Sequence, residues 1–165
     1  MLSCGEGFAQ GPTEYEVKAA YLYNFAKFVD WPSWTFDQTG GAMVLGVYGA
    51  DPFGSTLERM ASHQQVQGRA IVIKRARSFE ALGFCHVLFI GSPGQGGNWQ
   101  QTIRSASGSS RLVVGDADDF AQRGGAIGFF IEERRVRFTV NLSATDRAGL
   151  KLSSKLLKIA NVIRE

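Results

Sequence analysis

Three polar side chains that could bind a small molecule lie at the ends of predicted strands. Asp51, Ser92 and Asp116 each come at or just after the end of an apolar stretch of strand length. In an open parallel sheet the carboxyl ends of the strands share one edge, and ligands gather along that edge. The sequence therefore predicts a small-molecule site, for a nucleotide or an amino acid, that contains Asp51, Ser92 and Asp116.

A second polar group lies at the predicted junction between the last strand and the last helix. Asn141, Arg147 and Lys151 are close together in the sequence there. An arginine at this place could bind a carboxylate or phosphate group of a ligand in a bidentate manner. Alternatively, Arg147 forms a structural ion pair near the start of the helix, and the sequence alone leaves both interpretations open.

Residues for catalysis or for a metal centre are hard to find. His63 lies in a polar segment at a helix end, and His86 lies inside a strand next to Cys85, where neighbouring side chains point to opposite faces. No cluster of His, Cys and Asp has the spacing of a metal site. Ser92 has no base near it in the sequence and no nucleophile-elbow motif around it. We therefore expect no enzymatic activity, no metal and no cofactor.

The acidic residues and the glycine-rich loop have simple structural interpretations. Asp116, Asp118 and Asp119 resemble the acidic pocket of a receiver domain only weakly, and capping of a short helix over 118–123 is the simpler role. The segment 91–97 lacks the glycine and lysine spacing of a phosphate-binding loop, so a surface loop is expected.

An aromatic segment is the most unusual feature of the chain. Six aromatic residues fall within fourteen positions: Tyr21, Tyr23, Phe25, Phe28, Trp31 and Trp34. A buried helix needs about half of them, and Trp31 and Trp34 flank a proline with little room to bury both rings. Exposed aromatic side chains mark contact surfaces. We therefore predict a protein-binding surface that uses Phe28, Trp31 or Trp34.

The elements that must position these residues alternate between helix and strand. A helix begins at the capping box formed by Thr13 and Glu16 and ends at Asp30-Trp31-Pro32, with Val17, Tyr21, Phe25 and Phe28 on one face. The chain then alternates strands over 42–49, 69–75, 85–91 and 111–115 with helices, the first of which starts with Asp51 as its cap. This order predicts a parallel sheet with right-handed crossovers.

The C-terminal part departs from this alternation. Strands over 126–132 and 136–142 are joined by a short turn and form an antiparallel hairpin. A last helix follows, capped by Ser143, with leucines and isoleucines between 152 and 163 on its buried face. The predicted fold is therefore a single-domain α/β three-layer sandwich, with a mainly parallel sheet, a C-terminal antiparallel hairpin and flanking helices.

Composition places the chain among ordinary globular proteins. It has 165 residues, 44% of them hydrophobic, and a formal net charge of +3 that comes from scattered lysines and arginines, so nucleic acid is not an expected partner. No apolar run reaches the length of a membrane helix. Residues 1–12 form an N-terminal tail, in which 7–10 look like the end of a secretory signal cleaved after Ala9; a disordered tail is the alternative. Cys85 is expected to be a buried thiol.

Blocks of sequence, taken together, resemble the YfiR family of small bacterial periplasmic proteins. The resemblance is carried by Lys18–Pro32 (KAAYLYNFAKFVDWP), Cys85–Ile90, Gly124–Phe129, Val136–Leu142 and Arg147–Leu157. In order and spacing it covers roughly residues 14–163, which makes 13–165 a YfiR-like domain. Family members often carry paired cysteines near the hairpin, and this chain has none there.

The resemblance implies regulation by binding rather than catalysis. Members of the family repress membrane-bound diguanylate cyclases from the periplasm, by binding the periplasmic sensor region of the cyclase. Release of the cyclase allows synthesis of cyclic-di-GMP and biofilm formation. The resemblance also implies a homodimer. A periplasmic small-molecule binding domain is the alternative, with its ligand at the strand-end edge.

Overall fold

The computed structural model describes residues 12–91, 99–106 and 108–165. The predicted N-terminal tail, apart from Pro12, and the proposed ligand residue Ser92 lie outside these residues. The first described helix, α2 (Glu14–Lys27), begins at the predicted capping box, because Thr13 Oγ1 accepts a hydrogen bond from the Glu16 amide and the Glu16 carboxylate accepts one from the Thr13 amide.

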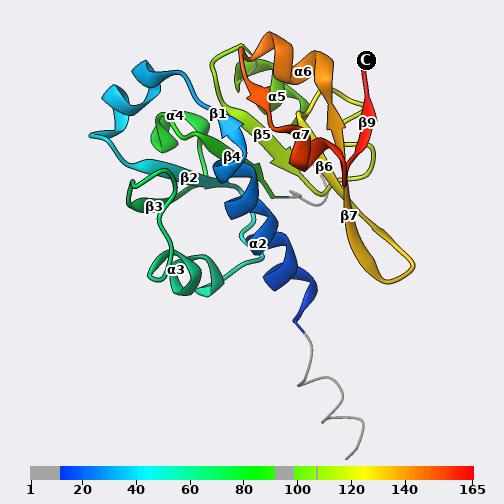
Figure 1. Ribbon diagram of the computed structural model, residues 1–165, viewed down its shortest axis with the longest axis horizontal. Helices are drawn as coiled ribbons and strands as arrows, with labels where there is room; N and C mark the ends of the chain where they lie inside the picture. The colour runs from blue at the N-terminus through cyan, green and yellow to red at the C-terminus, as the bar shows by residue number, and fades with distance from the viewer. Residues whose placement is uncertain (1–11, 92–98, 107) are drawn as a thin grey trace, which may run out of the picture.

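A seven-stranded sheet forms the centre of the molecule (Figure 1), in the order β3-β2-β4-β5-β6-β7-β9. Its strands are β2 (Met43–Tyr48), β3 (Ile71–Ala76), β4 (Val87–Ile90), β5 (Leu112–Gly115), β6 (Ile127–Glu132), β7 (Arg135–Asn141) and β9 (Asn161–Ile163). The strands from β3 to β6 run parallel, and β6 and β7 form the predicted antiparallel hairpin. The chain changes direction across the sheet between β2 and β4, which is the switch point of a doubly wound fold.

Helices cover both faces of the sheet, so the predicted three-layer sandwich is confirmed. On one face α2 and α3 (Thr56–Ala61) bury a large cluster that includes Leu22, Tyr23 and Leu57. On the other face α4 (Phe79–Leu82) and α5 (Trp99–Ala106) bury a smaller cluster that includes Leu82 and Ile103. None of the helices in the described residues is both long enough and apolar enough to cross a bilayer.

Aromatic rings of α2 fill the larger core, as expected for about half of them. Phe25 stacks on Phe129 with ring centroids 5.8 Å apart and meets the edge of Phe138 at 5.0 Å. Tyr21 packs beside Phe138 at 5.2 Å. These contacts hold the helix against the β6–β7 hairpin. The buried face of α2 is rotated from the predicted one, because it contains Lys18, Leu22 and Phe25 but not Val17.

The predicted last helix is wrong. Its region contains α6 (Leu142–Arg147), β8 (Lys151–Leu152), α7 (Ser154–Leu157) and β9 instead. Asn141 rather than Ser143 caps α6, and the helix stops just before Gly149, which has a φ of +74°. Ser153 then caps the separate helix α7. Ile159, which was predicted to be buried, is 55% exposed.

A second, two-stranded sheet ties the end of the chain to its first helix. The helix α2 ends at Lys27, earlier than predicted, and Val29–Asp30 form β1, which pairs antiparallel with β8. A 3-10 helix, η1 (Ser33–Thr39), follows Pro32. Two other helix predictions are wrong: Asp51 does not cap a helix, because α3 begins at Thr56, and 118–123 form turns.

Candidate functional site

The aromatic segment presents one exposed tryptophan. Trp34, on η1, is 47% exposed, and its nearest aromatic neighbour is Phe84 at 6.3 Å. Trp31 is only 7% exposed, and its Nε1 donates a hydrogen bond of 2.9 Å to the Ala26 carbonyl. Trp31 therefore presents little surface to a partner, because its ring and its one polar atom are used within the fold.

Trp31 belongs to an aromatic cage around a buried histidine. The rings of Phe36, Phe84 and Trp31 lie 4.5, 5.1 and 5.2 Å from the His86 ring. His86 Nδ1 accepts a hydrogen bond from the Val44 amide, and Nε2 has no partner in the described residues. Burial lowers the pKa of His86 to about 4, helped by the charge of Arg69. The imidazole is therefore neutral near pH 7, and its ring packs against the three aromatic rings of the cage.

Phe28 lies in a shallow hollow at the C-terminal end of α2. The hollow has a volume of about 430 Å³ and is formed by α2, the β1–β8 sheet, α7 and Gln67. Phe28 is partly buried, whereas Lys27, Lys151 and Lys155 around it are exposed. The structure thus brings the predicted partner residue Phe28 together with the predicted ligand residue Lys151.

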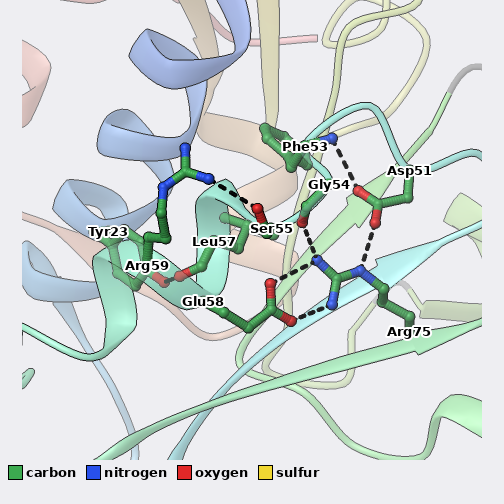
Figure 2. Close-up of polar contacts among 9 residues, drawn as sticks. All are labelled: Tyr23, Asp51, Phe53, Gly54, Ser55, Leu57, Glu58, Arg59 and Arg75. Carbon is green, nitrogen blue, oxygen red and sulfur yellow. Dashed lines mark hydrogen bonds and ion pairs between the residues drawn. The ribbon is translucent and has the colours of Figure 1, made fainter.

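Asp51 is already occupied by contacts within the fold (Figure 2). Its Oδ1 accepts a hydrogen bond from the Phe53 amide, and its Oδ2 accepts one of 2.5 Å from Arg75 Nε. Arg75 also pairs with Glu58 and donates to the Gly54 carbonyl. The hydrogen bond from Arg75 lowers the pKa of Glu58. This ion cluster fixes the loop between β2 and α3, so the Asp51 carboxylate is not free for a ligand.

Asp116 lies in a different part of the strand edge, beside a buried lysine. Its Oδ2 accepts hydrogen bonds from Lys18 Nζ at 2.9 Å and from the Tyr15 hydroxyl at 3.2 Å. Lys18 also donates to Glu14 at 2.6 Å, and its side chain is only 4% exposed. Burial lowers the pKa of Lys18, but the hydrogen bonds to the two carboxylates outweigh it, so the pKa is raised. Lys18 is therefore a permanent cation that joins α2 to the turn after β5.

A groove opens beside the Lys18–Asp116 pair. It has a volume of about 740 Å³ and runs between the first turn of α2, the 116–119 turn and the outer part of β6. Figure 1 shows that the start of α2 and the tip of the β6–β7 hairpin extend on the same side of the sheet. Asp118 and Asp119 are exposed along the groove, so its surface is predominantly acidic.

The predicted group of Asn141, Arg147 and Lys151 does not form one site. The Asn141 side chain is buried and caps α6, where its Oδ1 accepts hydrogen bonds from the amides of Ser143 and Ala144. Arg147 is exposed at the other end of that helix, and Lys151 is on β8 in the hollow around Phe28. No ion pair of Arg147 is found among the described residues, which contradicts its alternative role as a structural ion pair.

Two site residues were missed from the sequence. Lys18 is on the buried stripe of α2, four positions before Leu22, and a lysine at such a position signals a buried ion pair. Lys155 is the other one, because its position beside Phe28 depends on the β1–β8 pairing, which no local pattern indicates. In the described residues, no group of three or more His, Cys, Asp and Glu side chains could hold a metal ion. Cys85 is a buried free thiol, and burial raises its pKa to about 11.

A family model described as YfiR/HmsC-like matches residues 15–161 of the chain. No curated protein matches the chain.

Proposed function

The chain belongs to the YfiR/HmsC-like family, and on this premise we propose that it is a periplasmic regulator that represses a membrane-bound diguanylate cyclase. It would bind the periplasmic sensor region of the cyclase, lower cyclic-di-GMP synthesis and so restrain biofilm formation. The family match over most of the chain is the observation that carries the proposal.

A binding protein can hold a cyclase inactive only if it prefers the inactive state of the sensor. The shift in the equilibrium equals the difference in binding free energy between the two states. A change from 1% to 99% inactive sensor needs a preference of about 10⁴-fold. No catalytic residue is needed for this action, and we propose none. The family also implies a homodimer, which sedimentation of the purified chain would test.

The exposed ring of Trp34 is the first contact that we propose for the sensor. We expect Trp34→Ala to weaken binding of the full chain to the sensor region by about 30-fold, because exposed tryptophans often dominate interfaces. The free energy of unfolding should fall by about 1 kcal/mol, because only about half of the side chain is buried. Surface-immobilised sensor regions of the diguanylate cyclases from the same genome would give the dissociation constants.

Ile131→Ala is the matched control for this prediction. Ile131 is 50% exposed, like Trp34, but is in the β6–β7 hairpin rather than in η1. The Ile131→Ala variant should bind the sensor region with the wild-type affinity. Equal loss of affinity in both variants would remove Trp34 from the interface, and no binding of the wild-type chain to any sensor region would overturn the proposed function itself.

A small-molecule binding role is a second candidate, favoured by the groove beside Asp116. The carboxylates that line this groove suit the ammonium group of an amino acid better than the phosphate of a nucleotide. Mass spectrometry of the protein purified under native conditions would detect such a ligand. Loss of the ligand in Asp118→Asn/Asp119→Asn would place it in the groove.

A further inference from the structure

The hollow around Phe28 gathers lysines from three separate elements. Lys27 is the last residue of α2, Lys151 is on β8, and Lys155 is on α7. The antiparallel pairing of β1 with β8 places Asp30 opposite Lys151 and brings the segment after α2 beside the segment after α6. A positively charged surface is thus built by the fold and is not visible as a basic run in the sequence.

The charges of these lysines are not neutralised by ion pairs within the described part of the chain. None of the three forms an ion pair with any residue in the part of the chain that the structure describes. Asp30 is the one carboxylate that lines the hollow, so the lining carries three positive charges and one negative charge. A net charge of +2 therefore gathers at one hollow, although the whole chain carries only +3.

The base of the hollow is apolar and its backbone is fixed. Leu152 is 9% exposed and packs in the larger core, and Phe28 is partly buried against the same core. The Phe28 carbonyl accepts a hydrogen bond of 2.8 Å from the Ser153 amide, and the Val29 carbonyl accepts one from Gln67. An incoming apolar side chain would therefore meet a preorganised surface, which reduces the entropy cost of binding.

We propose that this hollow is the docking site for an acidic segment of the sensor region, in which an apolar side chain contacts Phe28 and flanking carboxylates pair with Lys27, Lys151 and Lys155. The inference rests on the proposed function and adds the chemistry of the partner. Complementary charge of this kind speeds association and selects the partner. A protein segment is favoured over a lipid surface, because binding to lipid would require apolar side chains that project outward and none of the exposed large hydrophobic side chains in the described residues lines the hollow.

Charge reversal in the full-length chain tests the docking site. We expect Lys151→Glu/Lys155→Glu to weaken binding to the sensor region by 10-fold or more, and we expect the wild-type affinity to fall as salt is raised from about 0.05 to 0.5 M. The neutral variant Lys151→Gln/Lys155→Gln should show an intermediate loss and a smaller dependence on salt. Because these side chains are exposed, the melting temperature of the glutamine variant should be nearly unchanged, whereas the glutamate variant should melt slightly lower, since it places a carboxylate opposite Asp30.

Arg104→Glu is the matched control, because Arg104 is exposed on α5, which packs on the opposite face of the sheet. If the lysine variants bind as well as Arg104→Glu while the wild-type chain binds the sensor, the docking site is wrong and the proposed function stands. If vesicles containing phosphatidylglycerol bind the wild-type chain, and the lysine variants lose only that binding, the partner is a membrane and the inference is overturned. If no sensor region binds the wild-type chain, both proposals fail together.

Discussion

Replacing Lys18 with methionine is expected to lower the free energy of unfolding by about 3 kcal/mol, which corresponds to a fall of roughly 10 °C in the melting temperature. Methionine keeps the length of the side chain but removes the charge. Asp116, whose side chain is 10% exposed, would then keep only the Tyr15 hydroxyl as a partner. A carboxylate left in such a place without its cation is strongly destabilising. Urea unfolding followed by circular dichroism would measure the loss.

Two further variants separate the buried pair from the exposed one. Glu14→Gln removes the other partner of Lys18, but Glu14 is 44% exposed, so the cost should be below about 1 kcal/mol. The double variant Lys18→Met/Asp116→Asn should recover most of the stability lost in Lys18→Met, because it leaves no buried charge unpaired. A double variant as unstable as Lys18→Met would mean that the lysine stem, not the ion pair, holds α2 in place.

Acid is expected to destabilise the protein through His86. The pKa of His86 is lowered from 6.5 to about 4 in the folded protein, so between these values the unfolded chain takes up a proton that the folded protein does not. The stabilisation from neutral His86 is complete above pH 6.5 and is lost as the pH falls toward 4. A shift of this size corresponds to roughly 3 kcal/mol. Urea unfolding at intervals between pH 7.5 and 4 would trace the loss.

The other histidine of the chain provides the control for this pH dependence. His63 is exposed at the end of α3, so His63→Gln should follow the wild-type curve. His86→Gln should have a lower free energy of unfolding at pH 7.5. That free energy should fall less on acidification than in the wild-type chain, because the variant has no imidazole at this position and only the carboxylates still titrate. If the free energy of unfolding fell with pH equally in His86→Gln and in the wild-type chain, His86 would not be a buried neutral imidazole. The rings of Phe36 and Phe84 join His86 to η1, so protonation should also loosen the segment that carries Trp34.

The sequence predicted the strands from β2 to β7 well, because each of them has a strong local signal. Met43–Tyr48 and Val87–Ile90 are short apolar runs between turn residues, and both are buried on their two faces. The start of α2 was equally predictable, because the capping box is a contact between residues three positions apart. Such local patterns need no knowledge of the rest of the fold.

The C-terminal segment failed because tertiary pairing overrides its helical pattern. Leucines at 152 and 156 have helical spacing, yet Leu152 is in β8, and its partner Val29 lies far away in the sequence. Gly149 and Ser153 were local signals that a single long helix was wrong. No local pattern indicated the partner strand itself.

The candidate sites show the same limit. The sequence indicated little room to bury both Trp31 and Trp34, but the cage around His86, which contains Trp31, determines that Trp34 is the exposed one. Asp51 and Asp116 do follow parallel strands as predicted. Their partners Arg75 and Lys18 come from other elements, and only the folded chain shows that both carboxylates are already bonded.

The pairing of β1 with β8 also determines when the proposed docking hollow can exist. Val29 and Leu152 are partners in this sheet, so forming it closes the chain between residues 29 and 152 into one loop. Contacts this distant in sequence slow folding and form only once the intervening chain is available. A nascent chain that ends before Lys151, or a chain that a protease has cut before that residue, would have α2 without Lys151 and β8 beside it. A partner that recognises this hollow would therefore bind only chains that have been synthesised beyond Lys155 and have paired β8 with β1.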